Sequence, residues 1–144
     1  MMFPILEIST PRELSRLVDG RSDDEIAAGV AAAGVDRALE RVFTGMVKHY
    51  LPDRGPRRRT AIEFVIKTDD GPRVRQFVAD RERPSWHDGA REAAEVRVEI
   101  RLADFLRLVS GRLDGFAALA RRKLKVRGNY LMASGIQRWF DLSF

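Results

Sequence analysis

The sequence predicts a single domain in which helices come first and strands follow. Through the first fifty residues, apolar side chains recur every three or four positions, as they do on one face of a helix. From residue 60 onward, apolar and polar residues alternate, as they do on the two faces of a strand. Beyond residue 100, segments with the helix pattern alternate with segments with the strand pattern. We therefore expect residues 1–51 to form a helical part and residues 60–144 to form a sheet with its own helices, all within one domain.

Two short helices are predicted near the start of the chain. Residues 10–13 (Thr-Pro-Arg-Glu) and 22–25 (Ser-Asp-Asp-Glu) both have the spacing of a capping box, in which a hydroxyl and a carboxylate satisfy backbone N–H groups at the start of a helix. These signals predict helices over residues 11–18 and 22–33. Gly34 is expected to end the second one.

The strongest helix signal covers residues 37 to 50. We expect Asp36 to cap this helix and Pro52 to end it. Its apolar residues form one continuous stripe, which is typical of a helix with one buried face. The stripe consists of Leu39, Val42, Phe43, Met46, Val47 and Tyr50.

The strands are predicted from period-two alternation. Residues 62–66 alternate in this way, and a turn over residues 69–72 (Asp-Asp-Gly-Pro) joins them to a hairpin partner over residues 73–79. A short third strand is predicted over residues 83–88. The clearest half-exposed strand covers residues 95–101.

Helices and strands alternate in the last part of the chain. A helix is predicted over residues 104–110, and Asp114 is expected to cap a second short helix. Residues 123–127 predict an edge strand, because their lysines and arginine alternate with apolar residues and would face water. A final helix with an apolar stripe is expected over residues 130–140.

This last series resembles the sterol carrier protein type-2 family. Residues 96–113 (VRVEIRLADFLRLVSGRL) resemble that family's alternating strand and the D-F-L-x-L-x-x-G helix that follows it. Residues 123–129 (KLKVRGN) resemble its G-K-L-K-[IV]-x-G-[DN] strand, and an apolar helix again comes next. The resemblance covers residues 95–140 well. With the hairpin from residue 62 included, it extends further in element order.

The resemblance implies an α+β fold with a twisted, mostly antiparallel sheet of about five strands and helices packed on one face. The N-terminal helices would be additions to that domain. Members of the family hold a fatty acid, acyl-CoA, sterol or other lipid in an apolar tunnel between the sheet and the C-terminal helices, without covalent chemistry. We therefore expect non-enzymatic binding or transfer of a hydrophobic ligand, with no cofactor.

The apolar stripes of the strands and C-terminal helices supply the tunnel candidates, since a lipid site needs a concave wall with few polar groups. The candidates are Phe64, Phe77, Phe105, Leu106, Val109, Phe116, Leu119, Met132, Ile136, Trp139 and Phe140.

Positive charge gathers in the same region. Residues 97–138 hold ten Lys or Arg against three acids, and the rest of the chain is nearly neutral. Two basic runs, each preceding a strand, are candidates for docking an anionic headgroup or phosphate. They comprise Arg57, Arg58, Arg59, Arg121, Arg122 and Lys123.

Several function classes find no support in the sequence. The absence of cysteine excludes thiolate catalysis and Cys-based metal sites. His49 and His87 lie far apart without metal-ligand spacing, so a structural or surface role is expected for each. No nucleotide-binding loop or nucleophile motif occurs, and no catalytic or metal site is predicted. No apolar run approaches the roughly 20 residues of a membrane-spanning helix, and we expect a cytoplasmic protein.

The sequence leaves two further questions open. Tyr130 and Trp139 are bulkier than the family's usual residues, which favours an alternative in which the cavity is filled and the fold serves as a protein-interaction or regulatory module. Besides a lipid ligand, an anionic membrane surface or a protein partner is compatible with the charge. Nucleic acid has little support beyond charge, because no reader motif is present. The oligomeric state is open, with a dimer among the options.

Overall fold

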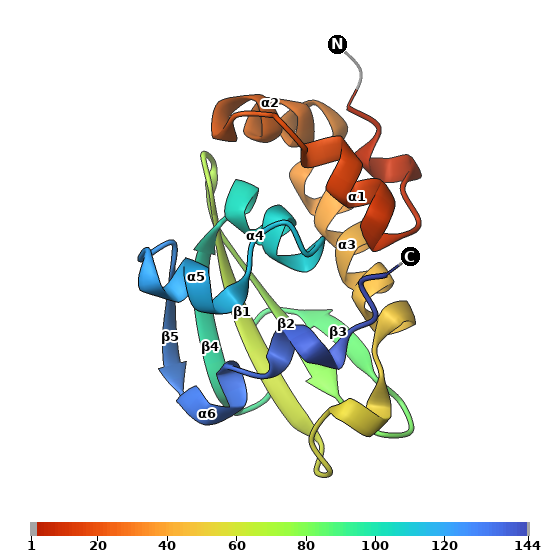
Figure 1. Ribbon diagram of the computed structural model, residues 1–144, viewed down its shortest axis with the longest axis vertical. Coiled ribbons are helices and arrows are strands. Elements are labelled where there is room, and N and C mark those ends of the chain that lie inside the picture. Colours follow the sequence, from red (N-terminus) through yellow and green to blue (C-terminus); the bar gives the residue numbers. More distant parts are fainter. Residues whose placement is uncertain (1–2, 144) are drawn as a thin grey trace.

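Five strands form one sheet in the order β3-β2-β1-β4-β5, as the computed structural model of residues 3–143 shows (Figure 1). The strands are β1 (Thr60–Thr68), β2 (Gly71–Ala79), β3 (Ser85–Asp88), β4 (Ala94–Arg101) and β5 (Leu124–Gly128). β1 pairs in parallel with β4, and the other three pairings are antiparallel. The predicted α+β fold with a mostly antiparallel sheet is confirmed.

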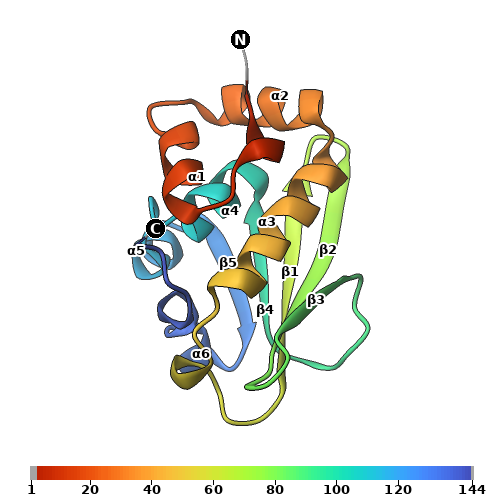
Figure 2. The same cartoon turned by 90° about the vertical axis from the view of Figure 1, so that its right-hand side faces the viewer.

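The helices precede and interrupt the strands. They are α1 (Pro11–Val18), α2 (Asp23–Ala33), α3 (Val35–His49), α4 (Leu102–Val109), α5 (Gly115–Ala120) and α6 (Tyr130–Ala133), with short 3-10 turns η1 (Ile5–Glu7), η2 (Pro52–Arg54) and η3 (Ile136–Trp139). α3 runs along one face of the sheet, and α2 lies at one end of it (Figure 2). Within residues 3–143, no helix is both long enough and apolar enough to cross a membrane.

The two predicted N-terminal caps are present. The Thr10 hydroxyl accepts the Glu13 N–H at 3.1 Å. The Ser22 hydroxyl accepts the Glu25 N–H at 3.1 Å, and the Ser22 N–H donates to the Glu25 carboxylate at 3.0 Å, which completes a capping box. Both helices therefore begin where local hydrogen bonding favours a start.

The predicted cap of α3 is wrong. The helix begins at Val35, and no side chain caps it; the preceding Gly34 has a positive φ of 100°. The Asp36 carboxylate instead accepts hydrogen bonds from Arg73 at 3.0 Å and Arg75 at 2.8 Å. Because the helix already begins at Val35, Asp36 lies within its first turn and not at the cap position, and its carboxylate makes two charge-assisted hydrogen bonds with strand β2.

The predicted final helix over residues 130–140 is also wrong. α6 ends after four residues, and η3 follows only after the Ser-Gly pair at residues 134–135, two poor helix formers. Beyond η3 the chain becomes extended, and Phe140 forms an antiparallel bridge with Tyr50 at the end of α3. This long-range pairing draws the C-terminal segment across the helix-covered face of the sheet.

The core joins the helical part to the sheet. The Phe43 ring of α3 stacks on Phe105 of α4 with centroids 5.5 Å apart and meets Phe64 of β1 edge-on at 5.7 Å. Alternate residues of the central strands point to the same face. Those residues are Ile62, Phe64, Ile66, Val96, Val98 and Ile100, and all are buried. One hydrophobic cluster thus includes residues from both parts of the chain.

Candidate functional site

A cavity of about 380 Å³ lies between the sheet and the segments that cover it. Its floor is made by helix-facing residues of three neighbouring strands. They are Phe64 of β1, Val98 of β4, and Leu124 and Val126 of β5. The period-two alternation of these strands places only apolar side chains on the floor, because every second residue points to the opposite face.

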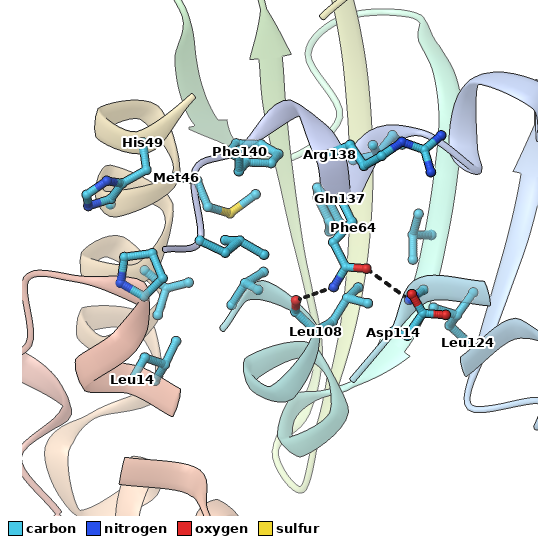
Figure 3. Close-up of a pocket in the computed structure, with 18 of the residues that line it drawn as sticks. Leu14, Met46, His49, Phe64, Leu108, Asp114, Leu124, Gln137, Arg138 and Phe140 are labelled. Carbon is cyan, nitrogen blue, oxygen red and sulfur yellow. Dashed lines mark hydrogen bonds between the residues drawn. The ribbon is translucent and has the colours of Figure 1, made fainter. Parts of the chain in front are cut away.

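One wall of the cavity belongs to the N-terminal part. Val42, Met46 and His49 reach it from α3, while Ile8 and Leu14 come from the chain before and within α1. Figure 3 shows Leu14, Met46 and His49 together on that side. The N-terminal helices are therefore part of the cavity wall and not an appendage to it.

The opposite wall and the cover come from the C-terminal part. Val109 at the end of α4, Phe116 and Leu119 of α5, and Ile136 and Phe140 of the last segment all line the space. These side chains are apolar, so a hydrocarbon chain in the cavity would meet few groups that require hydrogen bonds.

Gln137 holds the C-terminal segment in place over the cavity. Its amide nitrogen donates to the Leu108 carbonyl at 3.0 Å, and its amide oxygen accepts the Gly115 N–H at 3.1 Å (Figure 3). The amide nitrogen also donates to the Leu113 carbonyl at 2.9 Å. One side chain thereby satisfies three backbone groups, which lie at the end of α4, in the loop that follows and at the start of α5. The cover is thus tied to the opposite wall by directional bonds.

The charged groups of the lining are mainly cationic. Arg41, Lys48 and Arg138 are exposed at its rim, and Asp114 is the single acid among the lining residues that the structure describes. Asp114 is already engaged, since its carboxylate accepts the Ala117 N–H at 3.0 Å and caps α5. The rim therefore favours a ligand with an anionic end.

Two of the polar lining residues tie the N-terminal segment to α3. The Arg41 guanidinium donates to the Ile8 carbonyl at 2.7 Å. The buried His49 ring lies with Nε2 3.4 Å from the Ser9 carbonyl oxygen. Both contacts hold residues 8–9 against the cavity.

Six of the eleven tunnel candidates line the cavity and five do not. Those that line it are Phe64, Val109, Phe116, Leu119, Ile136 and Phe140; those that do not are Phe77, Phe105, Leu106, Met132 and Trp139. Phe77, Phe105 and Leu106 are fully buried in the core, and Trp139 packs edge-on against Tyr50. Periodicity shows that these residues face inward, but it does not separate a filled region from an open one.

The two basic runs lie at opposite ends of the sheet. Residues 57–59 precede β1 and residues 121–123 precede β5, but β1 is parallel to β4 while β5 is antiparallel to it. Neither run lines the cavity. Arg59 is engaged with the Glu92 carboxylate through two hydrogen bonds of 3.0 and 2.7 Å, whereas Arg57 and Arg58 are exposed.

The sequence prediction missed the N-terminal wall. Val42 and Met46 were on a recognised apolar stripe, but a stripe that faces a cavity has the same spacing as one that faces a packed core. Ile8, Leu14 and His49 had no signal that linked them to the C-terminal half. Their role depends on contacts between residues far apart in the sequence.

An apolar cavity beneath the covering segments of a sheet is the kind of site that holds a small hydrophobic molecule. The chain belongs to the SCP-2 sterol transfer family, whose pattern matches residues 56–141. This confirms the resemblance seen in the sequence, and it places the chain among domains for lipid binding or transfer. No curated protein sequence matches the chain.

Solved structures share the fold. Sterol carrier protein 2 like 2 from Aedes aegypti is 26% identical, with a TM-score of 0.53 over 72% of this chain and 94% of that one. The same protein in palmitated form is 24% identical, with a TM-score of 0.52 over 69% and 87%.

Two further structures are similar over part of their length. The sec-alkylsulfatase Pisa1 from Pseudomonas sp. is 15% identical, with a TM-score of 0.62 over 72% of this chain and only 16% of the sulfatase. Sterol carrier protein 2 from Yarrowia lipolytica in its apo form is 22% identical, with a TM-score of 0.49 over 54% of this chain and 63% of that one. This chain thus spans less than two thirds of either protein.

Proposed function

We propose that the chain binds one acyl-chain lipid with an anionic end, such as a fatty acid or acyl-CoA, non-covalently in the cavity. The observation that supports this most directly is the apolar floor of β1, β4 and β5 beneath a cationic rim. Palmitate on the Aedes relative agrees with an acyl chain. The N-terminal helices belong to the proposal as part of the same domain, because they supply one wall.

The dimensions and chemistry favour a slender ligand. A volume of about 380 Å³ lies near the small end of the range of about 300–1,000 Å³ typical of ligand sites. Burying a hydrocarbon chain contributes roughly 25 cal/mol per Å² before the cost of association. An anionic headgroup would remain at the rim near Arg41, Lys48 and Arg138, where it keeps its contact with water.

A carrier is better supported than an enzyme. Among residues 3–143, no group of three or more His, Asp or Glu side chains is arranged to hold a metal ion. Two polar residues of the lining already have structural roles, since Asp114 caps α5 and Gln137 satisfies three backbone groups.

The filled-cavity alternative loses its main support. It rested on the bulk of Tyr130 and Trp139. Trp139 is buried in the core away from the cavity, and Tyr130 is 60% exposed at its margin. Neither ring closes the space, so we do not propose this function.

The proposal is tested by measuring the ligand directly. Gently purified protein is expected to carry lipid in native mass spectrometry and to exchange it for a fluorescent fatty acid. Val126→Phe places a ring on the cavity floor and should lower fatty-acid affinity on the order of tenfold, because the added volume has no other space to enter.

A matched control is available on the other face of the sheet. Val74 of β2 points away from the cavity, opposite Val65 of β1, and Val74→Phe adds the same atoms there. We expect Val74→Phe to leave fatty-acid affinity unchanged. Repeated isolation without lipid, together with no uptake of the fluorescent fatty acid, would refute the proposed function.

A further inference from the structure

Large apolar side chains are exposed at one edge of the molecule. Within residues 3–143 they are Phe116 (59% exposed), Leu119 (38%), Tyr130 (60%) and Leu131 (86%). All four belong to α5 and α6, which flank the edge strand β5 (Figure 1). Single exposed apolar residues are ordinary, but a group of large ones marks an interaction surface. We call these four residues the edge patch.

The edge patch is continuous with the cavity. Phe116, Leu119 and Tyr130 line it, although each also has a substantial exposed surface. A side chain that is both lining and exposed stands at an opening. Leu131 follows Tyr130 on α6 and does not line the cavity. A ligand in the cavity would therefore not cover this exposed side chain.

The stretch of chain that carries the edge patch is strongly positive. Residues 112–138 contain seven Lys or Arg and one acid, Asp114, whereas the rest of the chain has nineteen basic and twenty acidic residues. Arg121 and Arg122 follow α5 and are exposed. Neither guanidinium has a hydrogen bond or ion pair with another residue of the described part of the chain. These cations are therefore available to an external anion.

The combination of exposed apolar side chains and free cations fits the interface of an anionic bilayer. Apolar side chains enter the boundary between headgroups and acyl chains, and each nearby Lys or Arg is attracted to anionic lipid. Nucleic acid would use the charge but leave Leu119 and Leu131 without a partner. The other exposed arginine pair, Arg57 and Arg58, has no large exposed apolar residue within its loop.

We propose that the edge patch docks on an anionic membrane surface and brings the opening of the cavity to the bilayer. The inference rests on the proposed function, since docking here would let a lipid pass between membrane and cavity. Its test is independent of that function, because vesicle binding is measured without a ligand in the cavity.

The experiment measures co-sedimentation of the whole chain with vesicles of phosphatidylcholine alone or mixed with phosphatidylserine. We expect binding to the mixed vesicles that weakens as salt rises, because salt screens exposed charges. Arg121→Gln combined with Arg122→Asn should lower the partition coefficient on the order of tenfold. Leu131→Ser should lower it by about tenfold through lost burial of an apolar side chain.

The matched control is Arg57→Gln combined with Arg58→Gln. It removes the same charge from the opposite end of the sheet, and we expect binding within about twofold of the unaltered chain. Equal loss in both double variants, or no binding of the unaltered chain to mixed vesicles, overturns the docking surface. Binding to soluble polyglutamate that matches vesicle binding and survives Leu131→Ser also overturns it, in favour of an acidic protein partner.

The two proposals fail separately. Uptake of a fluorescent fatty acid without vesicle binding overturns the docking surface and leaves the cavity function intact. Vesicle binding by the edge patch without fatty-acid uptake supports the docking surface and overturns the cavity function.

Discussion

The amide nitrogen of Gln137 donates to the carbonyl of Leu108 at 3.0 Å and so ties the C-terminal segment to the last turn of α4. The same amide nitrogen also donates to the Leu113 carbonyl, and the amide oxygen accepts the Gly115 N–H. A single residue thus holds the cover of the cavity to its wall.

Gln137→Leu should destabilise the protein by about 1–3 kcal/mol, because it keeps the bulk but leaves half-buried backbone groups without partners. Chemical denaturation measures this cost. Fatty acid should also dissociate faster, since the cover opens more readily. Gln137→Glu retains the acceptor for Gly115 but places a carboxylate oxygen against two carbonyl oxygens, so at neutral pH it should cost at least as much stability as Gln137→Leu. Unchanged stability and release in both variants would contradict the assignment.

Arg122 has a positive φ of 58°, the only such residue other than glycine in the described part of the chain. Its N–H donates to the Leu119 carbonyl at 3.1 Å, and the Lys123 N–H donates to the Ala118 carbonyl at 2.8 Å. These bonds form a Schellman motif, which places the residue after the C-cap in the left-handed region. In the G-K-L-K pattern that residues 123–125 resemble, the preceding glycine corresponds to Arg122, and glycine adopts this conformation without strain.

Arg122→Gly should therefore stabilise the protein by about 0.5–1 kcal/mol, because relief of the left-handed strain exceeds the added freedom of the unfolded chain. Arg122→Val should destabilise it by more than about 1 kcal/mol, since a β-branched side chain tolerates this conformation poorly. Thermal unfolding of the two variants decides the matter. Equal melting temperatures would contradict the backbone argument.

Interactions between residues close in the sequence were predictable, whereas interactions between residues far apart in the sequence were not. The Ser22–Glu25 capping box depends on residues three apart, so the sequence contains the whole interaction. Asp36 had an equally good local reason to cap α3, but its partners Arg73 and Arg75 lie on a strand more than thirty residues away. The extended end of the chain depends in the same way on the bridge between Phe140 and Tyr50.

The same distinction between local and long-range interactions applies to the residues of the site. Phe105 and Phe116 occupy similar positions in short apolar helices, yet the first is fully buried and the second is 59% exposed beside the cavity. Hydrophobic patterning predicted that both belong to an apolar region. The positions of α4 and α5 on the sheet decide which ring packs against neighbouring side chains and which ring borders the cavity.

Trp139→Ala should test the assignment of that ring to the core. The side chain is only 6% exposed, packs on Tyr50 at 6.4 Å between ring centroids and does not line the cavity. We expect a loss of about 3–5 kcal/mol in unfolding free energy, as for other buried aromatic residues. Phe116→Ala should cost less than about 1 kcal/mol and act mainly on fatty-acid affinity. The reverse order of stability losses would show that Trp139 is not part of the core.

Acid should weaken the contact between the loop after β3 and the start of β1. The Arg59 guanidinium, through two hydrogen bonds to the Glu92 carboxylate, holds the pKa of Glu92 below its ordinary value near 4.5, and His87 acts in the same direction. A carboxylate whose pKa is lowered by folding stabilises the protein above its unfolded pKa, and that contribution is lost as the pH falls through the folded pKa. The stabilisation is therefore fully present at neutral pH and is lost progressively as the pH falls from about 4.5 through the lower folded pKa.

Arg59→Gln should consequently lower the melting temperature at neutral pH. The difference in melting temperature between this variant and the unaltered chain should become smaller as the pH falls through this range. The comparison includes a smaller contribution from Asp80, whose pKa is lowered first by the backbone N–H of Arg83 and further by Arg59. Arg58→Gln serves as the control, because Arg58 is exposed and its side chain has no ion pair in the described residues. Melting temperatures measured across the acid range should converge for Arg59→Gln alone; curves that stay parallel would show that the Arg59–Glu92 contact does not stabilise the fold.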